Sequence, residues 1–200
     1  MMKILSGYSY DRLISELDAI QKNPLEGISV SIKNGDIFRW KVKLTGPQNT
    51  VYDGGVFILK LYFQSDYPES PPLISFKTKI FHPNVDNYGI VHLGILQTSN
   101  WTSEKTALDI LQSVQHLLVN PTSDYPGNLQ AQALYQTQRE LFDHQAQSWT
   151  YKYATNETIL TILVQYLRMF TSSSKSRISN FSKAYKTAKE TSHFIKCLKF

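Results

Sequence analysis

The chain has 200 residues, of which 42% are hydrophobic and 18% charged, a composition that fits one soluble globular domain with a sizeable core. Its net charge of +5 is unevenly placed, because residues 1–154 (the body) carry a net charge of −1 and residues 155–200 (the tail) a net charge of +6. The basic character therefore belongs to the tail and gives no evidence that the body binds nucleic acid.

The sequence shows no signal for insertion into or transport across a membrane. No run of about 18 apolar residues occurs, so we expect no transmembrane segment. The first residues, MMKILSGYSYDRL, lack the apolar stretch of a secretory signal. The single cysteine, Cys197, has no partner for an internal disulfide, which favours a cytoplasmic or nuclear location.

The first predicted element is a helix over residues 9–22. Leu13, Leu17 and Ile20 recur at helical spacing, and Pro24 ends the pattern. One face of this helix is therefore expected to pack on a core.

Alternating residues then predict an antiparallel meander. Residues 37–44 place apolar and basic side chains on opposite faces, as in a half-buried strand. A turn at 53–55 leads into a more buried strand over 56–63, and the proline-rich loop DYPESPP precedes a further strand over 73–81. A helix followed by a meander is an α+β arrangement.

The second half of the body is predicted to be helical. An apolar stripe at helical spacing begins after Ser103 and ends before Asn120-Pro121; its members are Ala107, Ile110, Leu111, Val114, Leu117 and Leu118. Residues 129–142 and 144–153 are predicted to form two further helices.

The tail divides into an apolar, helix-compatible segment over 157–170, a polar linker over 171–179 and a basic, helix-prone segment over 180–200. The basic segment could meet an anionic membrane or nucleic acid, although a solvated face is the simpler interpretation; its lysines are Lys183, Lys186, Lys189, Lys196 and Lys199. Cys197 is fourth from the end, as in a prenylation box, but a lysine next to last fits that box poorly.

Several motifs of the body occur together and in order. They are Tyr-x-Gly-Gly in VYDGGVF, Tyr-Pro-x-x-Pro-Pro in DYPESPP, His-Pro-Asn in IFHPN and a tryptophan in LGILQTSNW. With these motifs the body, over about residues 8–154, resembles the catalytic domain of ubiquitin-conjugating enzymes. The resemblance implies an α+β fold with an N-terminal helix, a four-stranded antiparallel meander, a crossover helix and two closing helices. The domain boundaries expected from it are 1–154 for the core and 155–200 for a C-terminal extension.

The resemblance implies acyl transfer, in which a cysteine ten residues after the His of His-Pro-Asn carries ubiquitin as a thioester. Here that position is His92. Imidazole is a competent nucleophile, but an acyl-imidazole is more activated than a thioester and water would hydrolyse it quickly. We therefore expect His92 to be a packed, partly exposed histidine rather than a carrier. No cofactor is expected, and no metal site, because His82, His92 and His116 lack cysteine or acidic partners at ligand spacing.

Other positions that the resemblance assigns to catalysis are also changed. The acid two residues after the cysteine, which orients the incoming lysine, is Gly94, and a second acidic position is Tyr125, with Asp124 beside it as a substitute. Asn84 stands at the position that supports the oxyanion. We expect Asn84 to hold its loop by hydrogen bonds, and we expect His82 to be structural.

The candidate binding residues follow from the same resemblance and are Arg12, Ser29, Glu69, Trp101 and Glu104. The position that enters a groove on the ligase is Glu69, and the second ligase contact, after Trp101, contains Glu104. In the family, basic residues of the first helix face the activating enzyme. Arg12 keeps one of these basic positions, whereas Asp11 and Ser15 occupy two others. Ser29 matches a serine with which some members bind a second ubiquitin, although a lone serine on a strand is usually only solvated.

These observations predict a ubiquitin-conjugating-enzyme-like protein that has lost thioester chemistry and acts as a non-catalytic partner or cofactor. Its partners would be ubiquitin or a ubiquitin-like protein, and an active conjugating enzyme or a ligase. Two alternatives stay open: a working enzyme with an unusual nucleophile, and a membrane-peripheral or structural adaptor targeted by its basic tail.

Overall fold

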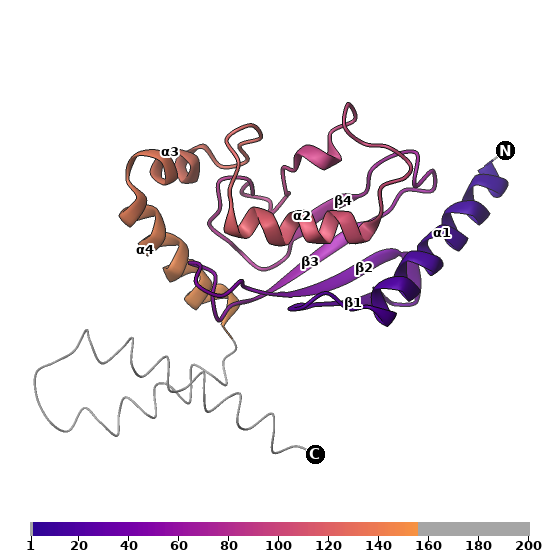
Figure 1. Ribbon diagram of the computed structural model, residues 1–200, viewed down its shortest axis with the longest axis horizontal. Coiled ribbons are helices and arrows are strands. Elements are labelled where there is room, and N and C mark those ends of the chain that lie inside the picture. Colours follow the sequence, from indigo (N-terminus) through magenta and orange to yellow (C-terminus); the bar gives the residue numbers. More distant parts are fainter. Residues whose placement is uncertain (1, 156–200) are drawn as a thin grey trace, which may run out of the picture. The chain divides into compact units, whose positions relative to one another are not determined.

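The computed structural model describes residues 2–155, and Figure 1 shows their arrangement. Met1–Ala154 form one compact unit. The elements in chain order are α1 (Met2–Lys22), β1 (Ile28–Lys33), β2 (Asp36–Thr45), β3 (Val56–Tyr62), β4 (Leu73–Phe76), the short 3-10 helix η1 (Gly94–Leu96), α2 (Ala107–Val119), α3 (Leu129–Thr137), α4 (Arg139–Trp149) and the π-helical turn η2 (Thr150–Ala154). The expectations for 157–170, for the linker and basic segment and for Cys197 lie outside the described residues.

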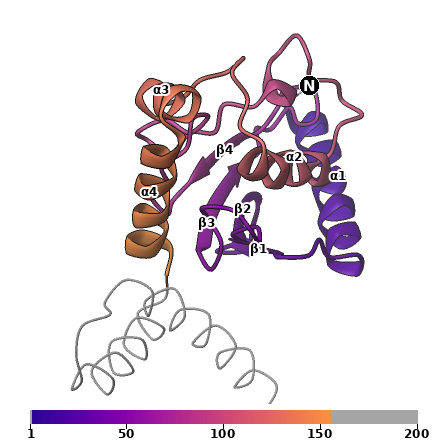
Figure 2. The same ribbon diagram turned by 60° about the vertical axis from the view of Figure 1, so that its left-hand side comes forward.

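The four strands form one antiparallel sheet in the order β1-β2-β3-β4, which confirms the predicted meander and the α+β class. In Figures 1 and 2, α2 lies between α1 and the α3–α4 pair. The inner side chains of the strands and one face each of α1 and α2 share a single core, in which Trp40, Phe57 and Leu111 are almost fully buried. The outer side chains of the strands are exposed or partly exposed.

Helix α1 begins earlier than predicted, at Met2 instead of residue 9. Among residues 7–22, whose side chains the structure describes, Ser9 and Leu13 are the first buried positions, and both lie in the predicted stretch. Gly7 and Tyr8 just before it are exposed and add no apolar position to the helical pattern.

Strand β4 is shorter than predicted and ends at Phe76 instead of residue 81. The backbone N–H groups of Lys77 and Thr78 both donate to the Ile58 carbonyl, and the Thr78 hydroxyl accepts from the Ile58 N–H at 2.9 Å. The backbone groups of Ile58 are thus bonded to a turn instead of to a continuing strand, and β4 ends there.

The predicted boundary between the last two helices is wrong by several residues. The predicted helices 129–142 and 144–153 divide at Gln138, whose φ of −144° and ψ of 65° are not helical. Arg139 then pairs with Asp143 along α4 at 2.8 Å, so Asp143 lies inside a helix. No proline or glycine marks the true boundary, and composition alone does not indicate it.

Two sequence signals define α2: a capping box sets its start, and an apolar stripe gives its buried face. Thr106 and Asp109 form a capping box, in which the Thr106 hydroxyl accepts from the Asp109 N–H and the Asp109 carboxylate accepts from the Thr106 N–H. The predicted stripe of Ala107 to Leu118 is buried throughout. In the described part of the chain, no helix combines the length and the apolar character needed to span a bilayer.

Candidate functional site

The site centres on the loop that runs from His82 to η1. The backbone N–H of His92 donates to the Asn84 carbonyl at 2.8 Å, so the two residues lie side by side although eight positions apart. The His92 side chain is 37% exposed. Its imidazole packs on the chain at Gly127, where a Cβ atom would lie 2.7 Å from His92 Cδ2. Residue 92 therefore lies beside Asn84.

His92 has an acidic partner, contrary to the expectation from sequence spacing. Its Nε2 lies 3.4 Å from Asp86 Oδ2. The other oxygen of Asp86 accepts from the backbone N–H groups of Tyr88 and Ile90, both at 2.9 Å, and these bonds fix the carboxylate in its turn. Two side chains do not make a metal site, and residues 2–155 contain no group of three or more potential metal ligands.

Asn84 is fully buried, and its side-chain amide is committed to the loop after α2. Its Nδ2 donates to the Thr122 carbonyl at 2.9 Å, to the Thr122 hydroxyl at 3.1 Å and to the Tyr125 carbonyl at 2.8 Å. Its Oδ1 accepts from the Thr122 N–H at 3.0 Å. In this arrangement the amide joins two loops, and none of its hydrogens points to a reacting group.

His82 is buried and bonded through both ring nitrogens. Its Nδ1 accepts from the Asn84 N–H at 2.9 Å, so Nε2 carries the proton and donates to the Leu117 carbonyl at 3.0 Å. Burial lowers the pKa of His82 to about 4, although the bond to Leu117 acts in the opposite direction. The imidazole is neutral at physiological pH and links the loop to α2.

The two changed acidic positions lie against each other. A Cβ atom at Gly94 would be 3.0 Å from Cε2 of Tyr125, so the tyrosine ring occupies the space next to the glycine. Asp124 is exposed beside it. An open groove of about 820 Å³ begins at Gly94 and follows the outer side of α2 as far as His116 and Thr122.

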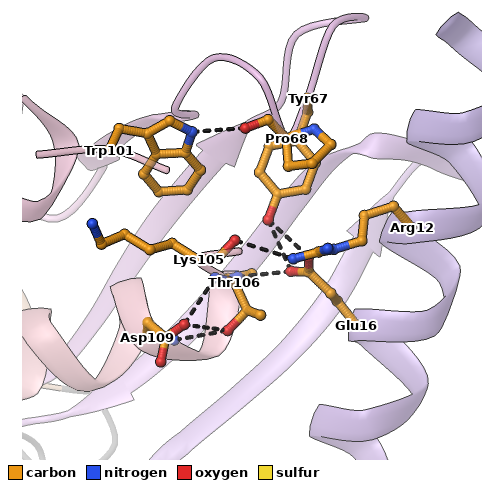
Figure 3. Close-up of polar contacts among 9 residues, drawn as sticks. Arg12, Glu16, Tyr67, Pro68, Trp101, Lys105, Thr106 and Asp109 are labelled. Atoms are coloured by element: carbon orange, nitrogen blue, oxygen red, sulfur yellow. Dashed lines mark hydrogen bonds and ion pairs between the residues drawn. The ribbon is translucent and has the colours of Figure 1, made fainter. Parts of the chain in front are cut away.

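A second cluster lies where α1 meets α2, and Figure 3 shows its contacts. The buried carboxylate of Glu16 accepts from Arg12 Nε, from the Tyr67 hydroxyl at 2.9 Å and from the backbone N–H of Ala107 at 2.7 Å. Arg12 also donates to the Lys105 carbonyl at 3.2 Å. One carboxylate thus connects α1, the proline-rich loop and the start of α2.

This cluster accounts for two of the predicted binding residues. Arg12 is tied to Glu16 and Lys105 and is only partly exposed, so less of its charge faces outward than expected. Trp101 is buried, and its indole N–H donates to the Pro68 carbonyl at 2.7 Å. The side chain therefore fastens one loop to the other instead of offering a contact surface. Glu69 and Glu104 are exposed on those two loops, and Ser29 is exposed on β1.

Sequence reasoning missed Glu16. A signal for it exists, because Glu16 lies on the same helical stripe as Leu13, Leu17 and Ile20, where an unpaired carboxylate would be costly. Burial first and the Glu16 carboxylate second raise the pKa of Tyr67 well above its usual range, so the phenol stays protonated and remains a donor.

The body was also compared with models of known protein families. The model described as ubiquitin-conjugating enzyme matches residues 12–150.

Proposed function

Because the chain belongs to the ubiquitin-conjugating enzyme family, we propose that it acts in the ubiquitin pathway as a binding partner without thioester chemistry. The observation that carries the proposal is the replacement of the reactive group: position 92 is an imidazole, and the sequence of the body contains no cysteine. A carrier has to hold its acyl group until the acceptor arrives, and an acyl-imidazole is too short-lived for that role.

The surroundings of His92 support the proposal. A lysine nucleophile with an ordinary pKa of about 10.4 needs a base to lose its proton, yet the nearest family position for one is Gly94, packed by Tyr125. The amide of Asn84 is bonded to Thr122 and Tyr125 and supports the loop. The two acids that the family resemblance expects beside the acceptor lysine are replaced at positions 94 and 125 by glycine and tyrosine.

The partners would be ubiquitin or a ubiquitin-like protein, together with an active conjugating enzyme or a ligase. Ser29 lies exposed on the edge strand β1, where it is accessible to a folded partner. Glu69 and Glu104 would disfavour docking of these loops into a ligase groove that is shaped for an apolar side chain, because a buried carboxylate without a partner is costly. A partner that accepts these two loops would therefore present basic groups to them. We further propose that the protein acts in the cytoplasm or nucleus.

A second candidate function is acyl transfer through His92. The contact between His92 and Asp86 favours it, since a carboxylate that orients an imidazole is the pairing used to activate histidine in hydrolases. A third candidate is an adaptor targeted by the tail, which predicts that removal of residues 155–200 abolishes localisation while the body stays folded.

Charging with labelled ubiquitin separates the first two candidates. The full chain is incubated with activating enzyme and ATP, and the products are run on a non-reducing gel with and without hydroxylamine. We expect no adduct with the wild-type chain. A hydroxylamine-sensitive adduct that persists in Cys197→Ser and in His144→Ala, an exposed histidine on α4, but disappears in His92→Ala would refute the proposal.

A further inference from the structure

The outer face of the sheet concentrates positive charge on a body that is almost neutral. Five exposed cations of β2, of β3 and of the residue after β4 point away from the core; they are Arg39, Lys41, Lys43, Lys60 and Lys77. The acid among the strand residues is Asp36, which pairs with Arg39 at 3.2 Å. Within residues 2–155 the four lysines form no ion pair with a carboxylate.

Two of these lysines are placed unfavourably for the isolated protein. Lys41 of β2 and Lys60 of β3 are direct partners in the strand register. Side chains in such a pair have Cβ atoms about 4.5–5.5 Å apart, and like charges directly opposite each other destabilise a sheet. The like-charge pair lowers the stability of the isolated protein, whereas a bound anion would remove the repulsion.

Apolar side chains border the cations along the β4 edge. Across the strands, one row runs from Arg39 to Tyr62 and Leu73, and the next runs from Lys41 through Lys60 to Ser75 and Ile90. The side chains of Leu73 and Ile90 are exposed by 63% and 46%, and Tyr88 at the adjacent turn is exposed by 88%. A basic surface thus continues into an aliphatic and aromatic edge.

The chemistry of this face distinguishes between polyanions. A single-stranded nucleic acid needs open aromatic rings on which its bases can stack. Among the described residues of this face, Tyr88 is one open ring, whereas the ring of Tyr62 is covered by the Arg39 guanidinium, whose Cζ lies 5.5 Å from the ring centroid. A single open ring does not form a platform for successive bases. Aliphatic side chains beside lysines suit a bilayer surface instead, where lysines meet phosphates and apolar groups enter the boundary with the acyl chains.

We propose that the outer face of the sheet is a docking surface for anionic phospholipid membranes. The cations that carry it are Lys41, Lys43 and Lys60, and the inserted groups are Leu73 and Ile90. The site belongs to the body and is separate from the basic tail. It extends the proposed function, because it would hold the protein at a membrane whether or not residue 92 carries ubiquitin.

Vesicle binding by the full chain tests the proposal. The partition coefficient is measured by co-sedimentation with vesicles of phosphatidylserine in phosphatidylcholine, and with phosphatidylcholine alone. We expect binding to the anionic vesicles only. The double variant Lys41→Gln/Lys60→Gln should lower the partition coefficient about 30-fold, since each basic residue at such a surface is worth about fivefold. The variant should remain folded, because it removes a repulsive pair.

The matched control removes two positive charges elsewhere, in Lys22→Gln/Lys152→Gln, which should leave most of the binding intact. Leu73→Ser/Ile90→Ser should weaken binding at high salt as well as at low salt, whereas the lysine effect should vanish at high salt. The tail is present in every variant, so it cannot account for the differences. The proposal is overturned if the wild-type chain fails to bind anionic vesicles or if Lys41→Gln/Lys60→Gln binds them as the wild type does. It is also overturned if this variant and the control variant lose binding equally. A larger loss of binding to a labelled single-stranded oligonucleotide than to vesicles would assign the face to nucleic acid and would overturn it too.

Discussion

The ring of Tyr125 lies in the place that a side chain at Gly94 would need, with 3.0 Å between Cε2 and a Cβ atom built on the glycine. The two residues are 31 positions apart, and the resemblance to ubiquitin-conjugating enzymes leads us to expect acids at both positions. Their replacements are therefore sterically linked: a side chain at position 94 requires the ring of Tyr125 to move by a few tenths of an ångström.

Replacing Gly94 by aspartate should destabilise the protein by about 1–3 kcal/mol, the usual cost of overpacking. Adding Tyr125→Ala should recover part of that loss, with a coupling free energy of about 0.5–3 kcal/mol in a double-mutant cycle measured by urea unfolding. Simple additivity of the two substitutions would contradict the contact.

His92→Cys should place a thiol at the family position without restoring efficient transfer to lysine. Gly94, Glu69 and Ser15 remain in that variant, so the acceptor lysine lacks its base and the loops keep their acidic groups. The measurement is the rate at which a charged variant discharges to free lysine, against a reference conjugating enzyme. A rate near that of the reference would show that the flanking positions are not limiting.

Asn84→Ala should lower the free energy of unfolding by about 1–3 kcal/mol, because the part-buried groups of Thr122 and Tyr125 lose their hydrogen-bond partner. Thermal and urea unfolding give the value. A neutral result would show that water replaces the amide and that Asn84 has another task.

Acid should destabilise the protein through His82. The pKa of this histidine falls from an ordinary 6.5 to about 4 on folding, mainly because the ring is buried. Between these two values the unfolded state binds a proton that the folded state does not, so the free energy of unfolding should fall by about 1.4 kcal/mol per pH unit as pH decreases. Above pH 6.5 the neutral His82 gives its full contribution to stability. Below about pH 4 both states bind the proton, so His82 causes no further fall in the free energy of unfolding.

The contribution of His82 is isolated by comparing pH profiles of the wild type and of His82→Gln. The slope between pH 6.5 and 4 should be smaller in the variant, whatever its absolute stability. His144→Gln, at an exposed position on α4, serves as the control. Parallel profiles for wild type and His82→Gln would exclude this histidine as the cause.

Glu16→Gln should destabilise the protein by about 1–3 kcal/mol. The carboxylate accepts hydrogen bonds from Arg12, Tyr67 and Ala107, whereas an amide would turn its own N–H group toward at least one of these donors. Asp18→Asn is the matched control on the same helix. Asp18 pairs with Lys22 at 2.7 Å on the surface, where such a pair is worth about 0–1 kcal/mol. Equal effects of the two variants would show that the buried network adds nothing.

Periodicity alone predicted much of the fold. The alternation over residues 37–44 gave β2 with the correct face buried, and the stripe from Ala107 to Leu118 gave α2. Strand β1 followed only from the family resemblance, because Val30 and Ile32 are only partly buried and the pattern is weak. The division at Gln138 follows from packing of two short helices and leaves no mark in composition.

The site was harder to predict, because its decisive contacts join distant segments. The contact of His92 with Asp86 depends on how the turn at 86–90 folds back. Neither the meeting of Gly94 with Tyr125 nor that of Glu16 with Ala107 can be read from spacing, since each pair comes together only when the helices pack.

The bond from the Ala107 N–H to Glu16 also offers a probe of the whole domain. Amides in the first turn of a helix have no partner within the helix and ordinarily exchange their hydrogen with solvent rapidly. The Ala107 amide is held by a carboxylate 91 residues away, so its deuterium uptake should be slow and should proceed only through openings that separate α1 from α2. A single slow amide at this position would thus report, in native conditions, the free energy that keeps the two halves of the chain together.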